Sequence, residues 1–356
     1  MNFISGMPTR GPQGSANSGC AVRRKQEHAA TSTMKLSLGL LTLLALTTIS
    51  SALTADGKRK LVLIAGKPSH PPLMHEFRAG SLVLEKCLKD VPSLIVDRHD
   101  QGWVKDEATF ADADAVVIYA DGGKGHPAVQ GTHLATLQAL IAKGVGFGAM
   151  HYGVEVLPDQ GGTEFKEWLG GHYEHQFSCN PMWEPHFTTF PTHPITQGVQ
   201  PFQIKDEWYM NMRFRPAFGD GTKAASDGKT SFVPILVAAP SDATRDGPYV
   251  YPKGPYPHIQ AEKGQQEAMM WAVEREDGGR GFGFTGGHFH LNWGNDSFRK
   301  TVLNALVWLA KGEVPTSGIE SKVSAEDLQQ NLDPKPERKA ASAPAVPQVF
   351  QRVAAK

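Results

Sequence analysis

The sequence predicts an α/β protein built around a mainly parallel sheet. Apolar runs rich in β-branched residues and Leu predict strands at 60–66, 93–100 and 113–123. The first of them shows no polar alternation, as is typical of a strand buried on both faces. Helical periodicity lies between them, at 74–90 and 128–144. Strands that alternate with helices are joined by right-handed crossovers and form a parallel sheet.

Each of these elements has a local signal. The strand runs KLVLIAG and ADAVVIYADGG both end in glycine, which marks the turn into the next element. In the first helix, Phe77, Leu82, Leu84 and Leu88 share one apolar side. The second helix stops at Gly144, because glycine readily adopts the left-handed backbone that closes helices.

The second half of the chain is less regular. We expect a fourth strand at 145–153, and the later strand-like runs are EPHFTTF, PILVAAP, EAMMWAVER and GRGFGFTGGHFH. Long Gly/Pro-rich loops separate them. A strong amphipathic helix at 297–312 begins at Asp296 or Ser297 as N-cap and stops at Gly312. We see no internal repeats.

The expected domain is a single folded unit at 56–315, followed by a tail. From residue 316 to 356 the sequence is polar and rich in Pro and Ala, and we expect this tail to be disordered. A truncation after Val314 is therefore expected to keep its melting temperature.

The composition excludes some classes of function. Lys plus Arg equals Asp plus Glu, at 36 each, whereas a nucleic-acid-binding protein usually has a basic excess. We therefore expect no nucleic-acid partner. Only three cysteines occur, at 20, 87 and 179, without a CxxC pair. One disulfide is compatible with this count, but nothing in the spacing demands it.

A secretion signal is expected at 34–52. Lys35 follows Met34, an apolar stretch runs from Leu36 to Ile49, and small residues end at Ala52. The stretch is too short for a comfortable membrane span. We interpret 1–33 as a non-native or disordered extension, the alternative being a cytoplasmic extension before an uncleaved anchor. The expected location is periplasmic or extracellular, with no stable membrane span after cleavage.

Histidines gather at one predicted edge of the sheet. Ligands of open α/β sheets bind beyond the carboxyl ends of the strands. The polar residues that follow the strands, together with one loop-rich group, are His70, His75, Asp121, His126, His151, Glu207, His288, His290, Asn292 and Trp293. A single loop histidine is usually solvated or hydrogen-bonded, so the coincidence carries more weight than any one of them.

His288 and His290 form a pair if the HFH segment is extended, because strand side chains repeat every second residue. Two imidazoles on one face are a common half of a site for a divalent metal such as zinc. The alternative is a polar lining of a sugar pocket without metal. Residues 146–153, GFGAMHYG, have the form of a nucleophile elbow with His151 at its centre.

The sequence resembles the trehalose-utilisation (ThuA-like) family of the class I glutamine-amidotransferase-like superfamily. The resemblance covers roughly 58–315 and rests on LVLIAGKPSHPPLMHEF, ADAVVIYADGG, GVGFGAMHYG, EWLGGHYEHQ, HPITQGV, DEWYM and GFGFTGGHFHLNW. It implies a flavodoxin-like, doubly wound sheet with helices on both faces.

The resemblance also implies a changed active site. Glutamine amidotransferases carry Cys at the elbow, where this chain has His151. His288 falls where their partner His lies, and His290 about where their Glu lies. Imidazole is a poor replacement for a thiolate as acyl acceptor, so we expect no glutaminase activity. The family is linked to disaccharide catabolism, often beside oxidoreductases that make 3-keto sugars.

Two functions follow as expectations. The first is an exported enzyme that processes glycosides or 3-keto-glycosides by acid/base chemistry, with or without a metal. The second is a non-catalytic carbohydrate-binding protein on the same fold. The small carbohydrate is the expected partner in both, and no nucleotide cofactor is expected. The assigned catalytic residues are His151, Glu207 and His288; the metal ligands are His151, His288 and His290; and the substrate-binding residues are His70, His75, Asp121, His175, Trp208, Tyr209, Asn292 and Trp293.

Overall fold

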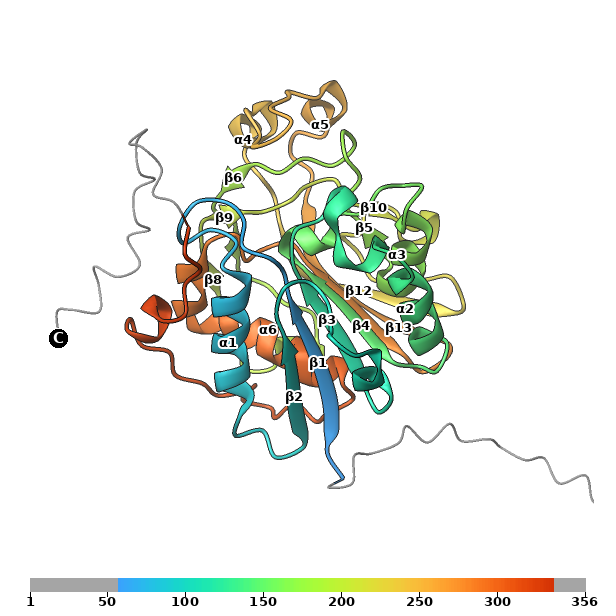
Figure 1. Cartoon of the computed structure of the whole chain (residues 1–356). Coiled ribbons are helices and arrows are strands. Elements are labelled where there is room, and N and C mark those ends of the chain that lie inside the picture. The colour runs from blue at the N-terminus through green and yellow to red at the C-terminus, as the bar shows by residue number, and fades with distance from the viewer. Residues whose placement is uncertain (1–56, 336–356) are drawn as a thin grey trace, which may run out of the picture. The chain divides into compact units, whose positions relative to one another are not determined.

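The computed structural model describes residues 57–335, which fold around an eight-stranded sheet (Figure 1). The strand order is β11-β12-β13-β14-β4-β3-β1-β2. The expected N-terminal extension, the signal segment at 34–52 and the tail beyond residue 335 lie outside the described residues.

Five neighbouring strands of the sheet are parallel, as predicted. They are β2 (Leu94–His99), β1 (Arg59–Ala65), β3 (Ala115–Tyr119), β4 (Gly146–Met150) and β14 (Arg280–Phe284). Every residue of β3 and β4 is buried, because helices cover both faces of the sheet. The carboxyl ends of these strands therefore meet at one edge.

The other end of the sheet is antiparallel. β13 (Glu267–Arg275) pairs with β14 on one side and with β12 (Thr230–Ala238) on the other, and β11 (Ala225–Ser226) forms the edge. The sheet is thus mixed, with the last parallel strand, β14, lying between β4 and β13.

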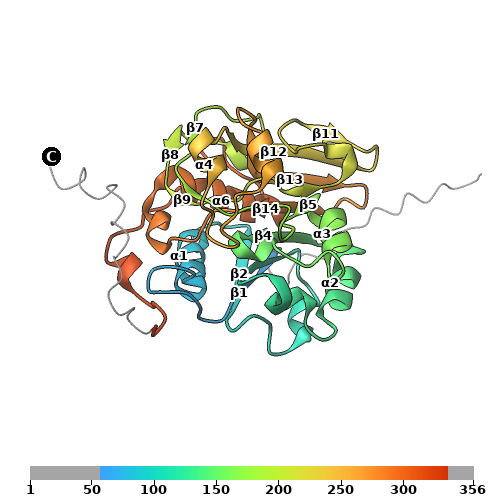
Figure 2. The same ribbon diagram turned by 90° about the horizontal axis from the view of Figure 1, so that it is seen from above.

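Two helices cover each face, which confirms the α/β architecture with flanking helices. α1 (Phe77–Leu88) and α6 (Asp296–Leu309) lie on one face, and α2 (His133–Ile141) and α3 (Gly162–Leu169) lie on the other (Figures 1 and 2). The alternation of β1 explains this, because Leu61 and Leu63 enter the core beneath α1 and α6 while Val62 and Ile64 enter the opposite core. Two short helices, α4 (Asp242–Asp246) and α5 (Pro257–Ala261), lie outside these layers.

Three short strand pairs lie outside the eight-stranded sheet. They are β5 (Gly171–His172) with β10 (Arg213–Phe214), β6 (Met182–Trp183) with β9 (Asp206–Glu207), and β7 (His186–Phe187) with β8 (Phe202–Gln203). Only two residues of the expected strand EPHFTTF are therefore extended. The 3-10 turns are η1 (Glu107–Phe110), η2 (Gly123–Gly125), η3 (Pro127–Val129), η4 (His151–Val154), η5 (Pro194–Thr196), η6 (Pro216–Phe218), η7 (His290–Gly294) and η8 (Asp327–Gln329).

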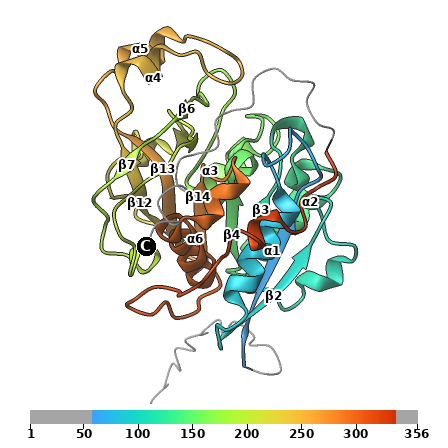
Figure 3. The same ribbon diagram turned by 90° about the vertical axis from the view of Figure 1, so that its left-hand side faces the viewer.

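Residues 316–335 pack against the domain, contrary to the expected disorder. Ile319 and Leu328 are buried, and the Ile319 N–H donates to the side chain of Asn304 on α6. Figure 3 shows this red segment beside α1. Isolated apolar residues in a polar sequence carry no periodic signal, which is why composition alone predicted disorder here.

No helix within residues 57–335 is both long enough and apolar enough to span a bilayer. Within residues 57–335, Cys87 and Cys179 are both free, so no disulfide joins these two.

Candidate metal centre

His151 stands at a strained turn directly after β4. Its φ is +53°, a left-handed backbone that side-chain-bearing residues adopt at a cost of about 1–3 kcal/mol and that recurs at functional sites. Its Nδ1 lies 2.9 Å from the Thr285 carbonyl oxygen. Because a carbonyl oxygen can only accept, Nδ1 carries the hydrogen and donates it. The lone pair of Nε2 then points away from Thr285, into the site.

His75 lies in the loop between β1 and α1, also with positive φ, at +48°. Its Nδ1 is 2.7 Å from Asp121 Oδ1, at the end of β3. The carboxylate accepts this hydrogen, so Nε2 of His75 also presents a lone pair. The His75 backbone N–H donates to the His288 carbonyl at 3.0 Å, which fixes the two loops together.

His288 and Glu207 complete the cluster from the other side. His288 follows β14, and its backbone N–H donates to Asp206 Oδ1 at 3.1 Å. The neighbouring Glu207, on β9, places Oε2 2.7 Å from His288 Nδ1. Its other oxygen accepts from Asn180 Nδ2 at 2.8 Å, which holds the carboxylate in this orientation.

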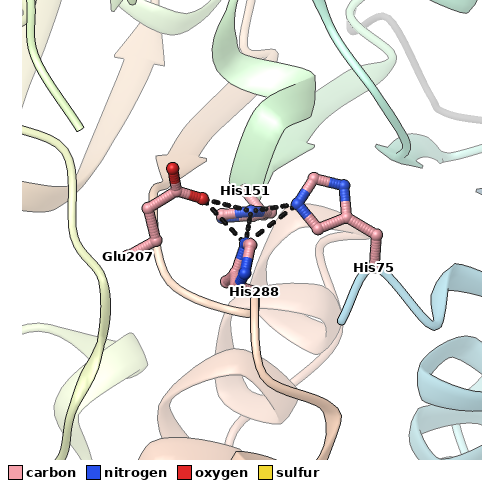
Figure 4. Close-up of side chains that lie close together, drawn as sticks. All are labelled: His75, His151, Glu207 and His288. Carbon is pink, nitrogen blue, oxygen red and sulfur yellow. Dashed lines mark hydrogen bonds and ion pairs between the residues drawn. The ribbon is translucent and has the colours of Figure 1, made fainter. Parts of the chain in front are cut away.

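One oxygen and three nitrogens therefore meet at one point (Figure 4). His75 Nε2 is 2.9 Å from His288 Nδ1 and 3.0 Å from His151 Nε2, and the last two atoms are 3.3 Å apart. Glu207 Oε2 is 3.5 Å from His151 Nε2. Ligands at about 2.0–2.1 Å around a tetrahedral zinc ion lie about 3.3 Å from one another, so these separations fit a four-coordinate ion.

The surroundings of the histidines also fit a metal ion. Imidazole ligands usually donate their second N–H to a carboxylate or a carbonyl, which sets the tautomer. His75 does so to Asp121 and His151 to Thr285. His288 lacks such a partner: its Nε2 is buried without a hydrogen bond to any residue between 57 and 335.

Glu207 and two of the imidazoles have shifted pKa values. Burial lowers the pKa of His151, but the hydrogen bond and charge of Glu207 outweigh burial and raise it. Burial and the neighbouring imidazoles lower the pKa of His75 well below its usual range. Burial opposes ionisation of Glu207, but His151 and His288 hold its pKa below its usual range. The charge of Glu207 thus favours a positive charge within the cluster, and protons would compete with a cation for the imidazole nitrogens.

The sequence profile of one family, described as trehalose utilisation, matches residues 74–309, a range that contains all four cluster residues. The chain belongs to the ThuA family. None of the curated proteins compared with it matches.

The ThuA domain is also similar to solved structures. A ThuA-like protein from Parabacteroides merdae has 15% identity over 75% of this chain and 94% of its own, with a TM-score of 0.49. A ThuA-like protein from Bacteroides uniformis has 11% identity over 72% and 94%, with a TM-score of 0.48. A cytoplasmic protein from Salmonella typhimurium LT2 has 12% identity over 70% and 99%, with a TM-score of 0.44.

Two of the predicted substrate-binding residues, His70 and Asp121, lie on the outer side of the buried cluster. The His70 ring stacks on His75 with centroids 3.5 Å apart, and its Nδ1 is 3.8 Å from Asp121 Oδ1. About a third of the Asp121 side chain and more than a third of the His70 side chain remain exposed. These two residues therefore link the buried cluster to the surface.

A cavity of about 590 Å³ opens beside Asp121, at the carboxyl ends of β1, β2 and β3. Its lining combines Trp103 with the hydrogen-bonding side chains of Gln101, Gln130 and His133. Aromatic rings and amide or imidazole groups are the side chains that suit a hydroxyl-rich ligand.

Other predicted site residues serve the core. Trp208 and Trp293 have no exposed surface and pack against Phe298, so neither offers a free face to a sugar. Tyr209 is buried beside His151, with ring centroids 5.3 Å apart. His175 is half-buried and lies near Tyr251, outside the cluster.

His290 does not join His288, because HFH is not fully extended. β14 ends at Phe284, and His290 begins the η7 turn, so the expected alternation is lost. His290 is buried near Glu76, Leu328 and Lys335, and burial lowers its pKa to about 4. Asn292 donates to Asp206 Oδ2 at 3.0 Å, and thus supports the carboxylate that holds His288.

Sequence reasoning missed two acidic residues. Asp206 accepts the backbone N–H groups of Gly287 and His288, which aims His288 into the cluster. Glu155 follows the elbow, is 8% exposed, and its side chain makes no hydrogen bond or ion pair with the residues described here. Burial and then the charge of Glu207 raise its pKa to about 8. Asp206 lies in the DEWYM segment that carries the family resemblance, but nothing in its spacing indicates that it would bind a backbone, and Glu155 lies in no segment that the sequence singles out.

Proposed function

We propose that this ThuA protein is a metal-dependent enzyme that processes glycosides or their 3-keto derivatives. The observation that carries the proposal is the convergence of His75, His151, Glu207 and His288 within 4.8 Å in the buried carboxyl edge of the sheet. When bound, a divalent cation would supply positive charge to stabilise an oxyanion of the substrate.

The chain's own groups divide the work. Three imidazoles and Glu207 would hold the ion, which gives His151, Glu207 and His288 the role of ligands. As a ligand, Glu207 would not be free to act as a base, so a different group would move the proton. We assign this role to Glu155, since its buried side chain has no competing partner among residues 57–335 and lies close enough to Glu207 to feel its charge.

The cavity beside Asp121 supports a carbohydrate as substrate, in agreement with the family's link to trehalose utilisation. A ketone at C3 acidifies the C2 proton of a sugar. In the proposed step, Glu155 takes the C2 proton, the electron pair forms a C1–C2 double bond, and the C1 substituent leaves with its bonding electrons. Protonation of that leaving oxygen, by Glu155 or water, completes the elimination.

Nuclear magnetic resonance in D₂O tests the proposal directly. Protein loaded with Zn²⁺ is incubated with a methyl 3-keto-glucoside and, separately, with methyl glucoside. We expect loss of the C2 proton signal or release of methanol from the keto sugar, and a rate at least about a hundred-fold lower in Glu207→Gln. The exposed Glu184→Gln is the matched control. Binding of the sugars without exchange or release would favour the carbohydrate-binding alternative and reject the enzyme.

Export remains part of the proposal, supported only by the sequence at 34–52. N-terminal sequencing of the protein recovered from the cell envelope or medium is expected to begin near Leu53. Recovery of a chain that retains residue 1 would contradict this expectation.

A further inference from the structure

We propose that the C-terminal strap, residues 327–335, is a positioning element that holds His75 in the metal centre. The inference rests on the proposed metal site, because the strap's contribution is to aim one of its four ligands. The strap begins at η8 and ends beside the loop that carries His75.

The main contact is a buried ion pair next to His75. Lys335 Nζ lies 3.0 Å from Glu76 Oε1, and the two side chains are 3% and 1% exposed. The same ammonium donates to the carbonyl oxygens of Met74 and His75, the latter at 3.2 Å. The ammonium of Lys335 thus contacts the ligand His75 and both of its neighbours in the chain, Met74 and Glu76.

Glu76 extends this contact in both directions. Its Oε1 accepts the Leu73 N–H at 2.9 Å, within the His75 loop, and its Oε2 accepts the Asp333 N–H at 2.8 Å, within the strap. One buried carboxylate therefore joins the strap to the loop. Removing Lys335 would leave this carboxylate buried without its cation, which is strongly unfavourable.

The loop needs such support because its backbone is strained. His70, Leu73 and His75 all have positive φ, at +60°, +65° and +48°. Such conformations persist only where the surroundings enforce them. On one side the loop bonds to the segment after β14, through His75 N to His288 O and His290 N to Leu73 O. The strap is the support on the other side.

The strap itself is anchored to α1, away from the cluster. Asp327 pairs with Lys86 at 2.6 Å, and the Asn331 carbonyl accepts from Arg78 at 3.1 Å. Leu328 is 1% exposed and inserts into the core on this face of the sheet. The position of the strap is therefore set independently of the residues that it holds.

Three full-length variants test the inference. Lys335→Met keeps most of the apolar part of the side chain and removes the charge. Lys335→Arg keeps the charge, and the exposed Lys322→Met is the control. Zn²⁺ affinity is measured by competition with a chromogenic chelator. Hydrogen exchange of the metal-free proteins, followed by mass spectrometry of peptides covering 70–77, reports the loop without requiring metal.

We expect Lys335→Met to bind Zn²⁺ at least ten-fold more weakly and to exchange faster at 70–77, with exchange in β3 and β4 unchanged. Lys335→Arg should recover most of the affinity, and Lys322→Met should match the wild type. Unchanged exchange at 70–77 in Lys335→Met would overturn the inference, as would faster exchange with undiminished Zn²⁺ affinity. If the wild type bound no Zn²⁺, the proposed metal function would fail, and the role of the strap in aiming a ligand would fall with it.

Discussion

Zinc binding should stabilise the folded protein through the cluster, and His288→Ala should abolish most of this effect. His288 Nδ1 lies within 3.3 Å of each of the other three ligand atoms. Its loss leaves three ligands. The metal-free protein should change less, because the substitution also removes a buried nitrogen, Nε2, that has no partner among residues 57–335.

The magnitude follows from the geometry. Five of the six separations between ligand atoms, at 2.7–3.5 Å, are near the tetrahedral value, so little reorganisation opposes binding and a dissociation constant of about 0.1 μM or below is expected. With free Zn²⁺ at about a thousand times that value, linkage stabilises the native state by about 4 kcal/mol. For a domain of this size, at about 2 °C per kcal/mol, the melting temperature should rise by about 8 °C. A hundred-fold weaker site in His288→Ala would leave about 3 °C.

Scanning calorimetry with Zn²⁺ and with excess chelator measures this difference at pH 7.5. The exposed His186→Ala controls for nonspecific binding to surface histidine. The zinc-dependent rise should shrink as pH falls, because protons compete for the imidazole lone pairs and Glu207 raises the pKa of His151. A rise below about 1 °C in the wild type, or the same rise in His288→Ala, would refute the reasoning.

Four further outcomes are expected. Glu155→Gln should reduce turnover at least about a hundred-fold in the D₂O experiment, while its Zn²⁺ affinity stays within about two-fold of the wild type. A loss of Zn²⁺ affinity would instead show that Glu155 supports the structure of the site and is not the base. Asp206→Ala should weaken Zn²⁺ binding although it removes no ligand, because the loop that carries the ligand loses its anchor. Burial lowers the pKa of His126 to about 4, against an ordinary 6.5, so the folded protein loses stability as the pH falls through this range. His126→Gln should therefore reduce the loss of stability between pH 7 and pH 4 by about 3 kcal/mol. The exposed His258→Gln should not reduce it. Truncation after Val314 should lower the melting temperature by several degrees, since buried apolar contacts are removed, and an unchanged value would show that the tail contributes nothing.

The parallel half of the fold could be predicted because its signals are local and redundant. The apolar runs of β1, β3 and β4 allow few alternatives, and the Gly-flanked turn after β4 marked His151 without reference to any other segment. The carboxyl-edge rule then brought His75, His151 and His288 to one place.

The parts that failed depend on tertiary context. Trp208 reads as a sugar-stacking residue in DEWYM, but the two-residue strand β9 turns it into the core while its neighbour Glu207 faces the cluster. His290 was paired with His288 by strand alternation, which ends once the backbone enters η7. Lys335 lies in a polar tail, and its side chain is buried because it forms an ion pair with the buried Glu76, which is distant in the sequence.

The four cluster residues come from four distant segments, and the contact between His75 and His288 joins positions 213 residues apart. None of these segments can arrange the ligands alone, and β14 must enter between β4 and β13 before His288 reaches its place. A folding transition state that lacks this insertion has no complete site, so an ion cannot accelerate its formation. Zinc should therefore act on the kinetics mainly by slowing unfolding, with the refolding rate nearly unchanged.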